Sequence, residues 1–257
     1  MIIHLPHSSR FIPAEYLNQF VVSEQRLQHE MNVMVDSFTD ELFGFNCAAE
    51  NVRTIVFPFC RLLVDPERFA DDSLEAMSKK GMGVLYSKTY KGEPLRRRLD
   101  EEERRDLLEK YYFPHQKSVS DAVSEELKKS GSSLVLDGHS FPSRPLPCHD
   151  DQTEPTPDFC LGTDSFHTPK KLTETIERKI KKLGYTVEIN RPFAGAFVPS
   201  AYYKKDKQVA ALMIEVNRRL YMDEESATKS ENFNRVQKHI KELLSEANGW
   251  LQSIEEA

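Results

Sequence analysis

Histidine and acidic side chains lie at the ends of three short apolar runs in this sequence. His7 follows the first run, His139 follows a run that begins at residue 133, and Glu215 lies near the end of the last run. Because ligand sites in open α/β sheets lie outside the carboxyl ends of the strands, we expect these side chains to meet at one edge. Two imidazoles and a carboxylate, with one position left for water, form the ligand set of a catalytic zinc ion.

The carboxylate ligand of such a site is left open by the spacing of the residues. Asp36 and Asp40 are four residues apart in the segment 32–43, which has a helical pattern. Periodicity alone favours a solvent-facing position for both acids. Asp137, two residues before His139, is either a further ligand, an acid that orients an imidazole, or a residue that shapes the turn. A single histidine could equally be a loop residue bonded to backbone, and only the joint pattern favours a metal.

Three arginines stand where they could meet an acidic substrate. Arg61 and Arg68 flank Asp65 shortly after the second apolar run, and Arg191 lies in a stretch that contains proline and glycine. A guanidinium group binds a carboxylate through two parallel hydrogen bonds, so these residues are candidate anchors for substrate carboxylates. The alternative for each arginine is an ion pair with an acid of the chain itself.

The elements that position these residues alternate between short apolar runs and longer amphipathic ones. This order is typical of helices packed on a mainly parallel sheet. The predicted strands are 1–5, 53–59, 133–138, 185–189 and 209–216, with a weaker sixth at 159–162, and the predicted helices are roughly 23–45, 100–129, 168–183 and 227–254. The stretches 60–95 and 141–158 are long loops, which in compact domains are functional or disordered. A loop over 141–158 next to His139 could act as a lid.

Length and composition restrict the class of protein. With 257 residues and 39% hydrophobic content, the chain can bury one core, and we expect a single domain over residues 1–257. A net charge of -6 disfavours a nucleic-acid partner and leaves a small-molecule substrate as the expected one. No apolar run is long enough to span a membrane. The cysteines, with no CxxC spacing, and the lack of a signal-peptide pattern predict reduced thiols in a cytoplasmic protein.

Eight ordered segments resemble the N-formylglutamate amidohydrolase family. They are LPHSSRFIP, DSFTDELF, FPFCRLLVDPERF, YYFPHQ, LDGHSFPS, PDFCLGTD, NRPFAGAFVP and IEVNRRLYMDE, and they extend from residue 3 to about residue 224. The resemblance implies a three-layer α/β/α fold around a central mixed, mainly parallel sheet, similar to zinc-dependent exopeptidases. It also implies hydrolysis of the amide of N-formyl-L-glutamate, or of a related N-acyl amino acid, to formate and glutamate in histidine degradation.

The resemblance also implies a ligand set. His7, Asp36 and His139 match the family positions that would hold one zinc ion per chain. Asp36 rather than Asp40 matches the first aspartate of its segment in the family. The chain is therefore expected to be a metal-dependent hydrolase of a linear amide bond.

Catalytic and binding roles follow from the same matches. Glu215 would take a proton from the attacking water and deliver it to the leaving amine, and Arg218 would stabilise the developing oxyanion. Arg61 and Arg191 would anchor the substrate carboxylates. Two alternatives remain: a metallocarboxypeptidase or peptidoglycan amidase, and a binding module that keeps the fold without turnover.

Overall fold

A six-stranded sheet forms the centre of the structure, a computed structural model that describes residues 1–44 and 51–255. The strand order is β2-β1-β3-β6-β4-β5, and only the β4–β6 pair is antiparallel. The strands are β1 (Ile2–Leu5), β2 (Arg53–Val56), β3 (Ser133–Phe141), β4 (Phe159–Gly162), β5 (Val187–Ile189) and β6 (Val209–Asn217). The predicted mixed, mainly parallel sheet is confirmed, including the weak sixth strand.

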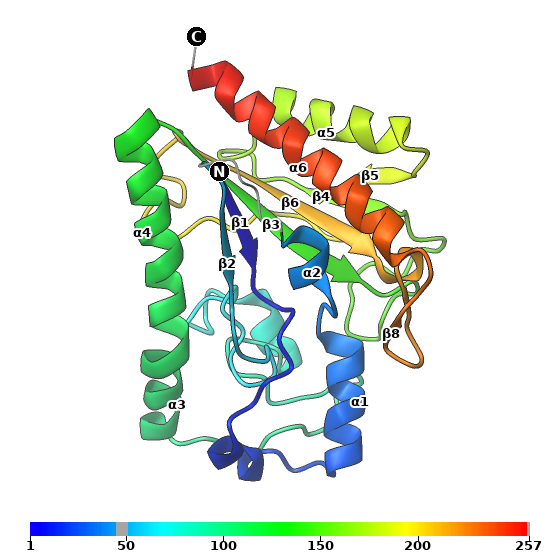
Figure 1. Ribbon diagram of the computed structural model, residues 1–257. Helices are drawn as coiled ribbons and strands as arrows, with labels where there is room; N and C mark the ends of the chain where they lie inside the picture. The colour runs from blue at the N-terminus through cyan, green and yellow to red at the C-terminus, as the bar shows by residue number, and fades with distance from the viewer. Residues whose placement is uncertain (45–50, 256–257) are drawn as a thin grey trace.

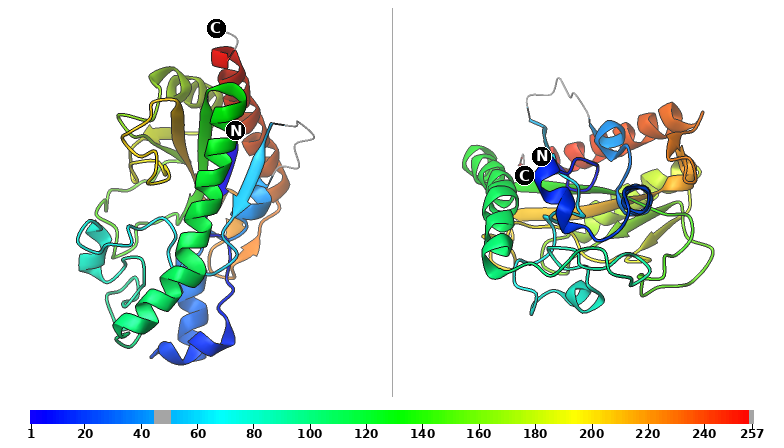
Figure 2. Two further views of the ribbon diagram at one scale, coloured as in Figure 1. Left: turned by 90° about the vertical axis from the view of Figure 1, so that its left-hand side faces the viewer. Right: turned by 90° about the horizontal axis from the view of Figure 1, so that it is seen from below.

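Helices cover both faces of this sheet, as the three-layer prediction requires (Figures 1 and 2). On one face lie α2 (Thr39–Phe43), α5 (Lys170–Lys182) and α6 (Phe233–Glu255), and on the other lies α4 (Phe113–Ser130). The remaining helices are α1 (Glu24–Met34) and α3 (Glu101–Leu107), and a short hairpin pairs β7 (Met222–Asp223) with β8 (Thr228–Lys229). Within the described residues, no helix is both long and apolar enough to cross a bilayer.

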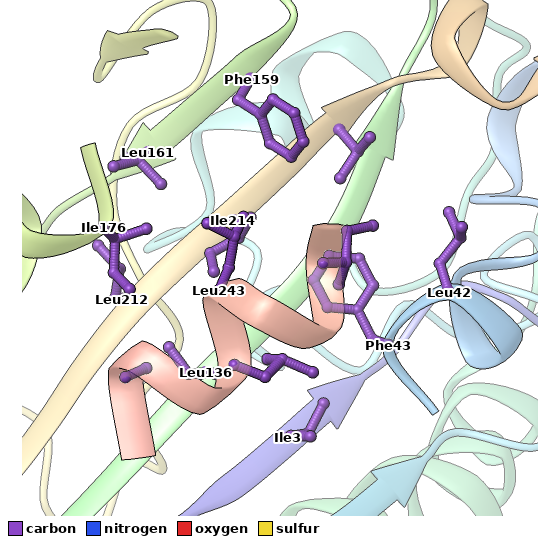
Figure 3. Packing of buried hydrophobic residues seen from close by; sticks show 14 of the residues in the cluster. Ile3, Leu42, Phe43, Leu136, Phe159, Leu161, Ile176, Leu212, Ile214 and Leu243 are labelled. Carbon is purple, nitrogen blue, oxygen red and sulfur yellow. The ribbon is translucent and has the colours of Figure 1, made fainter. Parts of the chain in front are cut away.

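The largest side chains of the core lie between the sheet and the α2, α5 and α6 layer. Figure 3 shows Leu136 and Ile214 of the sheet packed against Phe43, Ile176 and Leu243 of these helices. All nine residues of β3 and all nine of β6 are buried, because helices or loops cover both faces of these central strands. The strands can therefore bring polar side chains into the interior at fixed positions.

Strand β3 extends beyond its predicted end at residue 138. It continues to Phe141, so that His139 lies inside the strand and pairs with Glu215 in β6. The apolar pattern stops at Asp137, but the backbone ladder does not, because the buried polar side chains that follow find partners in the interior. Hydrophobicity alone therefore ends this strand too early.

The predicted helix over residues 23–45 is wrong between Val35 and Phe38, and residue 45 lies outside the described residues. Helix α1 ends at Met34, Phe38 has a left-handed φ of 68°, and α2 begins at Thr39. Asp36 therefore lies in a turn, where its backbone N–H donates to the carbonyl of His7 at 2.9 Å. This contact with a distant residue competes with helix continuation, which no local pattern shows.

Two other helix predictions need smaller corrections. The helix predicted to begin at residue 227 begins at Phe233, because Thr228 and Lys229 pair with β7. The predicted helix 100–129 contains a wider π-helical turn at Leu108–Tyr112, followed by Pro114. Proline has no N–H to donate to the carbonyl four residues earlier, which favours such a turn.

The described cysteines are Cys60, Cys148 and Cys160, and all three are buried and unpaired, as predicted for reduced thiols. Cys47 lies outside the described residues.

Glu30 on α1 makes the stability of the protein depend on pH. It is 3% exposed, and its Oε1 accepts the backbone N–H of Tyr90 at 2.7 Å. Burial raises its pKa from 4.5 to about 7. A raised folded-state pKa gives a contribution that is present below the unfolded value of 4.5 and is lost as the pH rises through about 7. Above that pH the fold holds a buried charge.

Glu30→Gln is expected to keep the acceptor for Tyr90 and remove this charge. We expect its free energy of unfolding to exceed that of the wild type by about 2 kcal/mol near pH 8, with the gain shrinking towards pH 5. Urea unfolding at both pH values measures the difference. Glu24→Gln, an exposed change on the same helix, is the control. A Glu30→Gln variant less stable than the wild type near pH 8 would contradict the assignment.

Candidate active site

The carboxyl ends of three parallel strands bring the predicted site residues together. His7 follows β1, His139 lies in β3, and Glu215 lies opposite His139 in β6. Asp36 reaches the same place from the turn between α1 and α2. Arg218, the first residue after β6, reaches it as well. The arrangement follows from the parallel direction of β1, β3 and β6, which places their carboxyl ends at one edge.

Three side chains converge closely enough to hold a metal ion. The Nδ1 atoms of His7 and His139 are 3.3 Å apart, and Oδ2 of Asp36 lies 3.0 Å from the Nδ1 of His139 and 3.6 Å from that of His7. Two ligands at 2.0–2.1 Å from a tetrahedral ion are roughly 3.3 Å apart, so this spacing fits a metal such as zinc. All three are buried, whereas Asp40 is exposed. The burial explains why Asp36 is the better candidate of the two.

A carboxylate contacts Nε2, the second ring nitrogen, of each histidine in this candidate ligand set. The Nε2 of His7 lies 2.9 Å from Oδ1 of Asp65, and the Nε2 of His139 lies 3.1 Å from Oδ2 of Asp137. A carboxylate can only accept here, so each Nε2 donates, and the neutral form of each imidazole would present the lone pair of Nδ1 to a cation. Asp137 thus contacts the imidazole of His139, which is the contact expected of an orienting acid.

Electrostatics keep this group charged in spite of its burial. Burial favours a higher pKa for Asp36, but its contacts with His139 and His7 hold the pKa well below its usual value. Burial likewise opposes the charged form of His139, yet Glu67 and Asp137 hold its pKa well above the ordinary value. Because a metal binds only the unprotonated imidazole, cation binding here would release protons.

Glu215 has the properties of a proton-transfer residue. It is 7% exposed, and its Oε2 is buried with no hydrogen-bond partner among residues 1–44 and 51–255. Burial raises its pKa to about 8, with the charges of Asp36 and Glu67 adding to the rise and those of His139 and Arg218 opposing it. A carboxyl group with a strongly shifted pKa and a free oxygen beside a ligand set is a candidate acid or base.

Arg218 is fully engaged within the chain. Its Nη2 donates to Oδ1 of Asp36 at 3.0 Å, its Nε to Oγ of Ser140 at 3.1 Å, and its Nη1 to the carbonyl of Val33. These contacts fix the orientation of Asp36. The predicted role of Arg218 at an oxyanion stays a prediction, since each of its guanidinium nitrogens already has a partner.

Arg61 donates hydrogen bonds to Asp65, the acid that contacts His7. Its Nη2 and Nε donate to Oδ2 of Asp65 at 2.8 and 3.2 Å, and Tyr86 donates to the same oxygen at 2.9 Å. Arg61, Asp65 and His7 thus form a continuous buried chain of contacts leading to the metal position. The structure shows for Arg61 the internal ion pair that was the alternative to substrate binding.

Arg191 is also paired within the chain. Its Nε donates to Asp151 at 3.1 Å, and its Nη1 donates to Glu188. Neither acid contacts the three candidate ligands in the described part of the chain. The substrate-binding role of Arg191 stays a prediction that would require these pairs to exchange for substrate.

Arg68, close to Asp65 in the sequence, was not predicted as a substrate anchor. Of the arginines considered for that role, it has the weakest contacts with acids of the chain. Its nearest acids, Asp65 and Glu75, are each 3.7 Å away, and its Nε is buried without a hydrogen-bond partner among the described residues. Its side chain is 27% exposed. The spacing between Arg68 and Asp65 can be read from the sequence. The lack of a hydrogen bond from Nε of Arg68 to the described residues cannot.

Two residues beside the ligands, His4 and Glu67, were not predicted from the sequence. His4 lies 2.9 Å from Oδ1 of Asp137 through Nδ1 and 2.8 Å from Nε2 of His115 through its own Nε2. Glu67 lies 3.3 Å from the Nε2 of His139 and is close enough to His4 and Asp137 for the three to form a second set that could hold a cation. His4 pairs with Asp137 across β1 and β3. The two-residue alternation of side chains along the first strand is the sequence signal that could have found His4.

A hollow of about 610 Å³ opens close to the ligands but is not lined by them. Ser8 and Ser37, the neighbours of His7 and Asp36 in the chain, line it together with Arg10 and Asn32. Because none of the candidate catalytic or metal-binding side chains reaches it, we do not take this hollow as the substrate pocket.

Comparisons with known proteins identify the family of this chain. The model of the N-formylglutamate amidohydrolase family matches residues 1–222. An N-formylglutamate deformylase of Pseudomonas aeruginosa is 25% identical over 261 residues, which cover 97% of this chain and 93% of that protein.

Two solved structures share the fold. The N-formylglutamate amidohydrolase of Ralstonia eutropha superposes with a TM-score of 0.84 at 24% identity, covering 98% of this chain and 94% of its own. A gene product of Agrobacterium tumefaciens gives a TM-score of 0.62 at 17% identity, with 95% and 90% covered. With the family match extending over most of its length, the chain belongs to the N-formylglutamate amidohydrolase family.

Proposed function

We propose that the chain is a single-domain, zinc-dependent amidohydrolase that converts N-formyl-L-glutamate, or a closely related N-acyl amino acid, to formate and the free amino acid. The observation that carries the proposal is the convergence of Nδ1 of His7, Nδ1 of His139 and Oδ2 of Asp36 within 3.6 Å of one another. The relative from Pseudomonas aeruginosa, named an N-formylglutamate deformylase, supports the choice of substrate.

His7, Asp36 and His139 would hold the zinc ion. When bound in such a site, zinc lowers the pKa of water and polarises a carbonyl oxygen. Asp65 and Asp137 keep the two imidazoles in the tautomer that presents Nδ1, and Arg218 keeps Asp36 in position. The chain thus supplies a preorganised set of ligands, which costs no reorganisation during the reaction.

Glu215 supplies the proton transfer. In its ionised form, Glu215 would take a proton on Oε2, which has no partner among the described residues, as the oxygen of water attacks the formyl carbon, and would return it to the amine nitrogen as the C–N bond breaks. The products are then formate and an amino acid with a free amino group. Because the carboxyl group is buried beside His139, bulk water does not compete for the proton at this position.

Substrate carboxylates require a cation whose donors are free. Arg61 and Arg191 were predicted for this role, but each already donates to an acid of the chain. Arg68 has an Nε without a hydrogen-bond partner among the described residues and a side chain that is 27% exposed, so we assign it as the first carboxylate anchor. Two parallel hydrogen bonds from its guanidinium would fit a carboxylate better than an amide.

Formate release from a panel of N-formyl amino acids tests both the reaction and the anchor. We expect N-formyl-L-glutamate to be hydrolysed much faster than N-formyl-L-glutamine. Arg68→Gln should raise KM for N-formyl-L-glutamate by about ten- to a hundredfold, the range of a lost charge-assisted hydrogen bond, and should reduce the preference for glutamate.

Arg191→Gln is the matched control, because it removes the other exposed candidate. If Arg191→Gln, rather than Arg68→Gln, lost the preference for glutamate, the anchor would be Arg191. Cleavage of dipeptides without formate release would instead favour a carboxypeptidase, and a wild type that binds zinc but turns over no substrate would favour a binding module.

A further inference from the structure

The loop between β3 and β4 holds His149 in a fixed place. Lys80 donates to the carbonyl of Cys148 at 2.7 Å and pairs with Asp150, the neighbours of His149 on either side. The Nε2 of Gln152 donates to the carbonyls of Leu146 and His149, each at 2.8 Å. The backbone around His149 is therefore tied down by contacts from both sides.

The same loop determines which ring nitrogen of His149 carries the proton. The backbone N–H of Leu146 donates to Nδ1 of His149 at 3.2 Å, so Nδ1 is an acceptor and the proton of the neutral ring lies on Nε2. Nε2 itself makes no hydrogen bond to the part of the chain that the structure describes. His149 thus offers a donor of fixed direction that the fold does not use.

Aromatic contacts connect the ring of His149 to Phe141, the last residue of β3. His149 packs edge to face on Phe193 with 5.1 Å between ring centroids, and Phe193 packs in the same way on Phe141 at 5.9 Å. The carbonyl of Phe193 accepts the thiol of Cys160, and Cys160 lies opposite Glu215 in the β4–β6 ladder. Phe193 therefore links His149 to Cys160, the residue opposite Glu215 in the ladder.

The charges around the ring favour its neutral form. Burial lowers the pKa of His149 to about 4, and the cationic Arg218 and Arg61 lower it further, with Lys80 adding and Asp150 opposing. At neutral pH the ring therefore stays uncharged, while Arg218 and Arg61 are the residues that fix Asp36 and Asp65. A neutral donor in this position does not compete with those arginines for the acids of the site.

We propose that Nε2–H of His149 donates a hydrogen bond to an anionic oxygen of the bound N-acyl amino acid, so that the loop between β3 and β4 takes part in substrate recognition. This inference rests on the proposed function, since it needs a substrate that carries a carboxylate. Arg68 would then contact the substrate from the segment after β2, and His149 from the segment after β3.

Kinetics of His149→Leu test the assignment. We expect KM for N-formyl-L-glutamate to rise about tenfold with kcat changed less than about threefold, because one substrate hydrogen bond is lost and the proton-transfer group remains. His149→Gln, which keeps an N–H donor, should recover part of the loss. His29→Leu, on the exposed face of α1, should leave both constants unchanged.

A chemical footprint on the wild type avoids dependence on the folding of a variant. Diethyl pyrocarbonate acylates accessible neutral histidines, and the product L-glutamate should protect His149 but not His29 from it, as peptide mass spectrometry would show. Formate release by the wild type, together with an unchanged KM in His149→Leu and no protection of His149, would overturn this inference alone. A wild type that releases no formate would overturn the proposed function and this inference with it.

Discussion

We expect the Glu215→Gln variant to lose roughly 10²–10⁴-fold in kcat while it keeps the metal content of the wild type. The amide of glutamine fills the same volume as the carboxyl group but cannot accept a proton from water. No side-chain hydrogen bond joins Glu215 to His7, Asp36 or His139, and its Oε2 has no partner in the described residues to leave unsatisfied. Formate release and elemental analysis of the same preparation measure the two quantities.

Glu174→Gln provides the control for this experiment, because Glu174 is exposed on α5 and far along the chain from the site. Its kcat should equal that of the wild type. Normal turnover by Glu215→Gln would mean that another base acts in the reaction. Glu67, whose Oε1 lies 3.3 Å from the Nε2 of His139, would be the next residue to test.

The His139→Ala variant is expected to lose both the metal and all measurable turnover. His139 supplies one of three candidate ligand atoms, and it also separates the charges of Asp36 and Asp137, with which its two nitrogens make contacts of 3.0 and 3.1 Å. Treatment of the wild type with a chelator should produce the same loss of activity. Added zinc should restore the wild type but not the variant, as formate release and elemental analysis would show.

His115→Ala is the matched control for a buried histidine in the same neighbourhood. His115 contacts His4 but none of the candidate ligand atoms, so its removal should leave the metal in place. A wild type that is active without metal would overturn the mechanism. Metal retained in His139→Ala would instead point to the second set formed by His4, Glu67 and Asp137.

The sheet was predictable because its strands are buried on both faces. Continuous apolar runs such as 209–216 are typical of central parallel strands, and even the four residues of β4 stood out from their surroundings. The turn at Asp36 was not predictable, because helix periodicity continues through it. It forms through a hydrogen bond from Asp36 to His7, a contact between segments whose approach depends on the whole fold.

The candidate site was predictable in its residue types and less so in its contacts. His7 and His139 follow from strand ends, and the choice of Asp36 came from the family resemblance rather than from spacing. The sequence places Arg61 and Arg68 about equally near Asp65, but only distances show that Arg61 donates hydrogen bonds to Asp65 at 2.8 Å, whereas Arg68 lies 3.7 Å from it. His149 carried no signal of its own, since its position depends on how the loop folds back over the strands.

The elements that carry the site residues differ in local stability. His139 and Glu215 lie in a ladder of nine buried residue pairs, which opens only when the sheet itself unfolds. Asp36, by contrast, comes from the four-residue gap between α1 and α2, where a backbone hydrogen bond to His7 and the side chain of Arg218 hold it. Local opening of that gap would free one ligand while the other half of the site stays intact. A metal ion held by this site would then exchange through opening of this turn, without global unfolding.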